Sequence, residues 1–399
     1  MTALARRTVV LVAVVGAAAV GAGAAMPAKP PRGQPIVIGA AVDLSNQMAP
    51  VDGPALAAAQ LEVKKINARG GVLGRPLQLE VIDDKLSPSV TKSAARSLIA
   101  RGADVLWVSC DVDYATPAIQ EGLSRGVLTV SPCIGTDQMG PKRFASAGRL
   151  AFSFGNVAQD EGAAMAEYAY KQKHWKTAIT VTDNLLVYFK DVCNAFTVRF
   201  KQLGGTITAA ESFTQGNKTI ENAVSHVARE KADVIALCTA FGDLTAGVAG
   251  IRSLGNTTPF VGPWSTDGSF WIPKLNPPLS DFYSVTFASV SGDDPSRDVR
   301  ALISGLRRQG KAPVRGGFLP GAAAIDAISA AITRTRSTNG TKLARALERF
   351  RNFPTISGPI SFSRTSHTVY GRPYRVVSTV AGQRRYVGMI RASSPAKIR

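Results

Sequence analysis

Histidine and cysteine are scarce in this chain of 399 residues, which contains three histidines and four cysteines. The histidines are scattered, and the cysteines lack the paired spacing that zinc sites require. The sequence also has no G-x-S-x-G segment, no phosphate-binding glycine loop and no closely spaced histidine pair. These absences argue against a metal-dependent or cofactor-dependent enzyme. We therefore expect no metal, no cofactor and no catalytic residue.

Acidic residues are few, with 28 Asp and Glu against 47 Lys and Arg, so the formal net charge is +19. The excess is concentrated after Arg297, where arginines are dispersed among helix and strand patterns. A nucleic-acid-binding surface is one interpretation of such a charge. We favour a solvated basic face, because the arginines are not grouped around an aromatic-lined groove. No nucleic acid partner is expected.

Long apolar runs are absent outside the first thirty residues, so no later stretch is expected to cross a membrane. Residues 1–30 are typical of a signal peptide: Arg6 and Arg7 precede an apolar core at 8–20, and small residues at 22–25 offer a cleavage site. No cysteine follows the apolar core, so lipid attachment is not expected. An uncleaved membrane anchor is the alternative. We expect an exported protein of the periplasm or cell envelope.

Strand and helix patterns alternate along most of the chain. Residues 104–137 predict a strand, a polar loop, a helix, a second strand and a second polar loop. After residues 144–156 a second series of such units begins, and the chain closes with strands at 371–380 and 383–389 around a tight turn. Repeated strand–helix units indicate parallel sheets, whose carboxyl ends bind small ligands. We predict an α/β fold with two similar lobes and a binding mouth in 104–137.

The cysteines are expected to form disulfides, because an even number in an oxidising compartment favours pairing. Cys110 and Cys133 end neighbouring predicted strands, so we predict a bridge between them. Cys193 lies in the helix that leads toward the strand ending at Cys238, which predicts a second bridge. Free buried thiols are the alternative for both pairs.

Three segments carry a resemblance to a known family. PIVIGAAVDLS from residue 35, INARGGVLGRPLQLEVIDD from residue 66 and GVLTVSPCIGTD from residue 126 occur in order. Together they resemble the periplasmic leucine/isoleucine/valine-binding protein family, the type I solute receptors of ABC importers. The resemblance runs from about residue 35 to residue 378.

The resemblance implies two Rossmann-like lobes joined by three crossover strands, with a ligand clamped between them. Lobe 1 is expected to comprise residues 35–153 and 288–355, and lobe 2 residues 154–287 and 356–390. It further implies a monomer that delivers a small molecule to an ABC permease in the membrane. The alternative is a ligand-sensing receptor module that passes lobe closure to a signalling partner. In neither case do we expect an enzyme.

The resemblance also implies where the ligand binds, because the family holds it with loops that follow the strands of both lobes. The corresponding residues are Cys110, Asp111, Asp113, Tyr114, Thr116, Ile134, Thr136, Tyr188, Phe241, Trp264 and Asp267. Two of them differ from the residues expected in a site that binds an amino acid, because Asp111 and Asp113 would repel the carboxylate of the ligand. In addition, Trp264 stands where amino-acid binders place an acid. We therefore expect a ligand that is either amino-acid-like or more apolar and aromatic.

Overall fold

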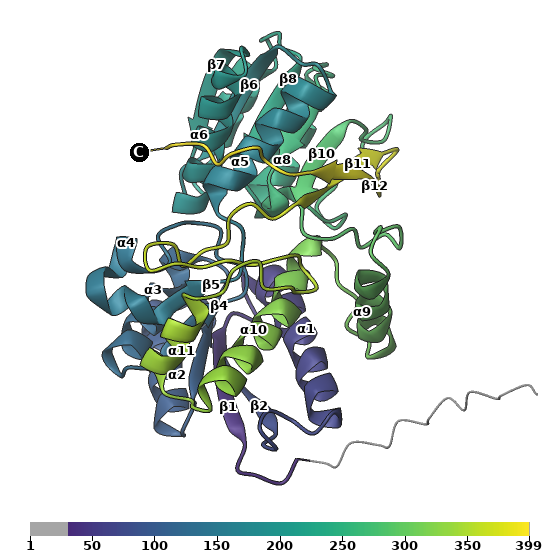
Figure 1. Ribbon diagram of the computed structural model, residues 1–399. Helices are drawn as coiled ribbons and strands as arrows, with labels where there is room; N and C mark the ends of the chain where they lie inside the picture. The colour runs from purple at the N-terminus through teal and green to yellow at the C-terminus, as the bar shows by residue number, and fades with distance from the viewer. Residues whose placement is uncertain (1–30, 399) are drawn as a thin grey trace, which may run out of the picture.

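Two α/β lobes, stacked one above the other, make up the computed structural model, which describes residues 31–398 (Figure 1). The expected signal peptide at 1–30 lies outside the described residues. The first sheet contains β1 (Ile36–Val42), β2 (Leu77–Asp83), β3 (Val105–Val108), β4 (Leu128–Ser131) and β5 (Ala151–Ser153). All its neighbours are parallel, in the order β2-β1-β3-β4-β5. The predicted doubly wound arrangement is confirmed.

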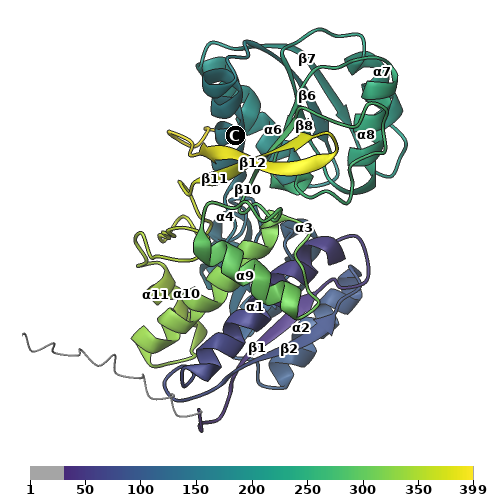
Figure 2. The same cartoon turned by 90° about the vertical axis from the view of Figure 1, so that its right-hand side faces the viewer.

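Helices cover both faces of this sheet and define lobe 1. They are α1 (Ala49–Ala68), α2 (Pro88–Ala100), α3 (Val112–Ser124), α10 (Leu319–Thr335) and α11 (Gly340–Leu347). The short α4 (Pro141–Phe144) precedes β5, and α9 (Arg297–Arg308) packs beside α1 (Figure 2). The first strand, β1, is almost entirely buried, because helices on both sides leave no solvated face.

One described helix is long and apolar enough to span a membrane, contrary to our expectation from the sequence. It covers Gly316–Thr335 and includes α10, and 78% of its most apolar window is buried inside the protein. The burial follows from its position, since α10 packs along α1 and its Ile325, Ile328 and Ile332 belong to the lobe 1 core. This segment is therefore a core helix of lobe 1.

Lobe 2 is built on a seven-stranded sheet in the order β12-β11-β10-β9-β8-β6-β7. Its strands are β6 (Thr177–Asp183), β7 (Thr206–Phe213), β8 (Val234–Cys238), β9 (Phe260–Gly262), β10 (Phe282–Thr286), β11 (Tyr374–Val380) and β12 (Gln383–Ile390). Its helices are α5 (Ala158–Glu167), α6 (Val187–Gln202), α7 (Ile220–Val227) and α8 (Phe241–Ser253). The strands from β7 to β10 are parallel, and β11 and β12 add an antiparallel hairpin. The predicted turn lies between them, with positive φ at both Ala381 and Gly382.

The chain passes between the lobes after β5, after β10 and before β11. The last passage runs beside the first: Val157 N–H donates to the Val369 carbonyl, and Ser153 N–H to that of His367. The expected start of the final lobe 2 segment at residue 356 is too early. The backbones of Phe353 and Ile360 are hydrogen-bonded to each other, and the Ile360 side chain packs in the lobe 1 core. Apolar residues therefore keep this stretch in lobe 1.

The passages are tied together by the buried guanidinium of Arg372. It donates to Asn156 Oδ1 at 2.7 Å, to the Phe154 carbonyl and to Ser357 Oγ. These partners lie on the first passage and on the stretch before the last one. A charge buried at this point is stabilised because each of its bonds has an oxygen acceptor.

Candidate functional site

A small pocket, with a cavity volume of about 20 Å³, lies between the two lobes at the carboxyl ends of their parallel strands. Lobe 1 contributes Met48, Val51, Cys110, Asp111 and Arg315, and lobe 2 contributes Leu186, Tyr188, Phe189, Ala240, Phe241, Trp264 and Ser265. Most of the lining is apolar or aromatic, with a few polar groups. This composition is usual for sites that bind small organic molecules.

The lobe 1 wall is formed by the first turn of α3. This helix starts at Val112, because the Asp111 side chain caps it. Asp111 Oδ1 accepts from Asp113 N at 2.8 Å and Tyr114 N at 3.3 Å. Burial, reinforced by the Asp113 charge, raises the pKa of Asp111 to about 7. The cap thus occupies N–H groups that a ligand carboxylate would otherwise approach.

The Cys110–Cys133 bridge holds this wall in place, and the prediction of that disulfide is confirmed. It joins the ends of β3 and β4, which are neighbours in the sheet. The second predicted bridge is wrong, because Cys193 and Cys238 are free and buried. Burial raises the pKa of the Cys238 thiol, and the neighbouring Cys193 raises it further. A thiol kept protonated in this way is a poor nucleophile for disulfide formation.

The lobe 2 wall is aromatic and is fixed from behind by Glu161 of α5. The backbone N–H of Trp264 donates to Glu161 Oε1 at 2.6 Å, and the Tyr188 hydroxyl donates to Glu161 Oε2 at 2.9 Å. The rings of Tyr188 and Trp264 lie 6.1 Å apart. Burial raises the pKa of Glu161 to about 8, which favours its protonated form at neutral pH. A neutral group therefore holds the backbone of Trp264 and the side chain of Tyr188.

Of the seven lining residues that the sequence reasoning missed, Arg315 is the charged one. It precedes η4 (Gly316–Phe318), the one-turn helix before α10, and is 1% exposed. Its only signal in the sequence is an arginine before two glycines, which is weak. The glycines matter, because a Cβ on Gly317 would lie 2.7 Å from the Trp264 ring. Close backbone approach at this point brings the arginine to the pocket.

Five of the eleven ligand-binding residues expected from the sequence line the pocket: Cys110, Asp111, Tyr188, Phe241 and Trp264. The other six lie nearby but have different contacts. Thr116 donates its hydroxyl to the Val112 carbonyl of its own helix, Tyr114 packs against a buried apolar cluster, and Ile134 is a core residue. Their contacts give them structural roles in lobe 1.

Asp113, Thr136 and Asp267 bond across the cleft instead of lining the pocket. Asp113 Oδ2 accepts from Val187 N at 3.0 Å, and Thr136 Oγ1 donates to Asp191 Oδ2 at 3.0 Å. Asp267 Oδ2 accepts from Gly316 N at 2.7 Å. Each bond joins one lobe to the other. The lobes are therefore closed against each other.

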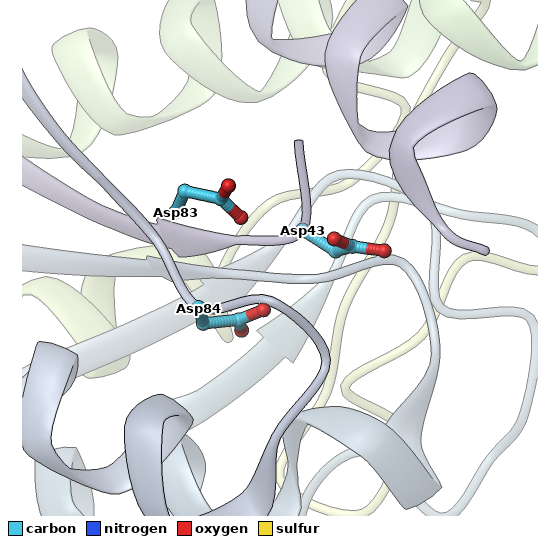
Figure 3. A group of neighbouring side chains, drawn as sticks. All are labelled: Asp43, Asp83 and Asp84. Atoms are coloured by element: carbon cyan, nitrogen blue, oxygen red, sulfur yellow. The ribbon is translucent and has the colours of Figure 1, made fainter. Parts of the chain in front are cut away.

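Three carboxylates lie together away from this pocket, where β1 and β2 end (Figure 3). The ligating atoms of Asp43, Asp83 and Asp84 lie within 4.8 Å of one another. They are engaged with the backbone, however: Asp43 accepts from three N–H groups, Asp83 from two and Asp84 from Leu86. These contacts assign the three side chains to loop structure.

The fold and the pocket define a two-lobed ligand-binding protein of the α/β class. Comparison with known proteins leads to the same class. The family model described as periplasmic binding protein matches residues 35–384, and this chain belongs to that family.

Its relatives are distant in sequence but cover most of the chain. The Leu/Ile/Val-binding protein BraC3 of Rhizobium johnstonii is 23% identical over 337 residues, which is 80% of this chain and 86% of that protein. The branched-chain amino acid transporter substrate-binding protein LivJ of Streptococcus pneumoniae, solved with isoleucine, superposes with a TM-score of 0.76 at 19% identity. The aligned region covers 88% of this chain and 99% of LivJ.

A third similar protein was solved with a different kind of ligand. It is a solute-binding protein of an ABC transporter from Rhodopseudomonas palustris, in complex with benzoate. It superposes with a TM-score of 0.72 at 18% identity, over 91% of this chain and 98% of its own. These likenesses support the fold assignment.

Proposed function

We propose that this protein is the extracytoplasmic solute receptor of an ABC importer. It binds a small organic ligand between its lobes, without catalysis, and presents the closed form to a membrane permease as a monomer. Membership of the periplasmic binding protein family supports this role. The relatives are named for branched-chain amino acids, and the structural neighbours were solved with isoleucine or benzoate. A ligand of partly apolar character suits the lining of the pocket.

The observation that carries the proposal is the composition of the pocket, which needs residues of both lobes. Met48 and Cys110 come from lobe 1, whereas Tyr188, Phe241 and Trp264 come from lobe 2. A ligand can contact both sets only when the lobes are closed. It therefore binds the closed form more tightly than the open form, which is the condition for a ligand to shift the equilibrium.

Contacts outside the pocket indicate how closure is latched. Asp113 binds the amide of Val187, Thr136 binds Asp191, and Gln47 Nε2 donates to Gln215 Oε1 at 2.9 Å. These bonds join loops at the strand ends of one lobe to the other lobe. Each exchanges a bond with water for a bond with protein, so its net contribution is about 0.5–1.5 kcal/mol. Such bonds stabilise the closed form only modestly. Binding of the ligand therefore determines whether the closed form predominates.

The test is ligand-induced closure, followed by thermal shift and small-angle scattering with a panel of amino acids, aromatic acids and their amides. We expect at least one compound to raise the melting temperature and reduce the radius of gyration. Trp264→Ala should weaken binding about tenfold or more. The matched control is Trp175→Ala, because Trp175 packs against Tyr283 in lobe 2 away from the pocket. Equal affinity of both variants would refute the site, and no closure with any compound would refute the role.

A further inference from the structure

The buried polar atoms of the pocket that have no partner are both hydrogen-bond donors. Arg315 Nε and Trp264 Nε1 are buried and have no hydrogen-bond partner among residues 31–398. Both side chains line the pocket, Arg315 from lobe 1 and Trp264 from lobe 2. Buried donors without partners are rare and costly in folded proteins. Two of them at one pocket indicate that an acceptor is supplied from outside.

Among residues 31–398, Arg315 forms no ion pair with a carboxylate. The acid that acts on its charge is Asp267, but Asp267 Oδ2 already accepts from Thr286 Oγ1 at 2.8 Å and from Gly316 N at 2.7 Å. The guanidinium carbon lies 4.7 Å from the centroid of the Phe270 ring, a contact that uses the face of the guanidinium and not its N–H groups. Burial lowers the pKa of Arg315 to about 10, so it remains charged at neutral pH.

The N-terminus of α3, where an anion could bind, is already occupied. At the start of α3, Asp111 covers the amides of Asp113 and Tyr114 with its own carboxylate. An anionic ligand group is therefore repelled from that end of the pocket. Aromatic side chains line the space between, namely Tyr188, Phe189, Phe241 and Trp264.

We propose that Arg315 anchors the carboxylate of the ligand, with Trp264 Nε1 as a second donor. The ligand is then a small monocarboxylate whose apolar or aromatic body lies against the aromatic side chains of lobe 2. This inference rests on the proposed function, since it names the ligand class of the same pocket. Arginine suits the role because its planar fork binds both oxygens of a carboxylate.

The experiment compares acids with their neutral or cationic amides. Benzoate, phenylacetate and leucine are measured beside benzamide, phenylacetamide and leucinamide, by calorimetry and thermal shift on the mature chain. The variants are Arg315→Met and, as a matched control, Arg252→Met. Arg252 also stacks on a phenylalanine, with its guanidinium carbon 4.4 Å from the centroid of the Phe260 ring, but it does not line the pocket.

We expect at least one acid to bind the wild type and Arg252→Met, and its amide to bind much more weakly. Arg315→Met should weaken acid binding about 30-fold or more, because a buried charge pair loses one member. Without ligand, Arg315→Met should melt at or above the wild-type temperature, because it removes a buried charge that has no partner. A marked fall in that temperature would show that Arg315 stabilises the fold, and would overturn the inference.

Two further results would also overturn it: acids that bind Arg315→Met as tightly as the wild type, or amides that bind as tightly as acids. In both cases the lobes still close around a ligand, so the proposed function survives. If no compound of either class binds or closes the lobes, the proposed function and the inference fail together.

Discussion

Replacing Glu161 by glutamine should flatten the dependence of stability on pH. Glu161 is fully buried, and its two oxygens accept from Trp264 N–H and from the Tyr188 hydroxyl. Burial raises the pKa of the carboxyl from 4.5 to about 8, and the charge of Asp160 adds to the rise. Glutamine resembles the protonated acid: its oxygen can accept from Trp264 N–H, and its NH₂ can donate to the Tyr188 oxygen.

The direction in which stability changes with pH follows from the number of protons that each state binds. In the unfolded chain Glu161 loses its proton near pH 4.5, whereas the folded protein keeps it until about pH 8. Between these values the folded state binds more protons, so the free energy of unfolding falls as pH rises. The stability that protonated Glu161 contributes is fully present below the pKa of this group in the unfolded chain. It is lost as pH rises through the pKa of the group in the folded protein. The slope for one such group is at most about 1.4 kcal/mol per pH unit.

The assay is thermal unfolding at a series of pH values from about 5.5 to 8.5. Between pH 5.5 and 8.5 the melting temperature of Glu161→Gln should fall less than that of the wild type, by about 1–2 °C for each kcal/mol of pH-dependent stability that the substitution removes. Some slope remains in the variant, because burial also raises the pKa values of Asp52, Asp111 and Asp160 to about 7. The curves should converge toward acidic pH.

Glu121→Gln is the matched control. Hydrogen bonds from Arg96 lower the pKa of Glu121, so this carboxyl is ionised in both the folded and the unfolded states above pH 6. Its replacement should shift the whole curve without changing the slope. The reasoning about Glu161 is refuted if the wild type and Glu161→Gln lose stability in parallel between pH 6 and 8.

Two other perturbations test the structure around the pocket. Cys110→Ser with Cys133→Ser should lower the free energy of unfolding by about 3 kcal/mol, because the bridge closes a loop with a sequence separation of 23. Denaturant unfolding measures this loss, and a double variant as stable as the wild type would contradict it. Thr136→Val should weaken ligand binding by about 2- to 12-fold without touching the pocket, because it removes the bond to Asp191 that latches the lobes. Thr116→Val, which loses only a bond within α3, should bind like the wild type in calorimetry, and equal effects of the two variants would show that the latch does not contribute.

Much of the fold could be predicted from the sequence because it is encoded locally. The alternation of apolar strands and amphipathic helices predicted two parallel sheets, and the tight turn before β12 predicted the closing hairpin. The first disulfide was also predictable, because Cys110 and Cys133 end strands that are consecutive in sequence and adjacent in the sheet. The second pair shows the limit of this reasoning. The burial of Cys193 and Cys238 depends on how α6 packs, which spacing does not encode.

The candidate site also contains residues that were expected before the structure was known and residues whose roles were not. The aromatic residues Tyr188, Phe241 and Trp264, which the family resemblance implied, line the pocket. The roles of Asp113 and Thr136 could not, because their partners Val187 and Asp191 belong to the other lobe. From sequence alone, a residue that latches the lobes looks the same as one that contacts ligand.

By itself, then, the sequence determined the class of fold, the number of lobes and the edge of each sheet where the pocket lies. These features depend on periodicity and on strand order, which neighbouring residues specify. Tertiary structure alone decided which charge in the pocket has no partner. Asp111 is occupied by amides of its own helix, whereas Arg315 approaches the pocket from a segment more than two hundred residues away along the chain. Whether a buried charge is satisfied depends on every neighbour in space, and only the folded chain brings those neighbours together.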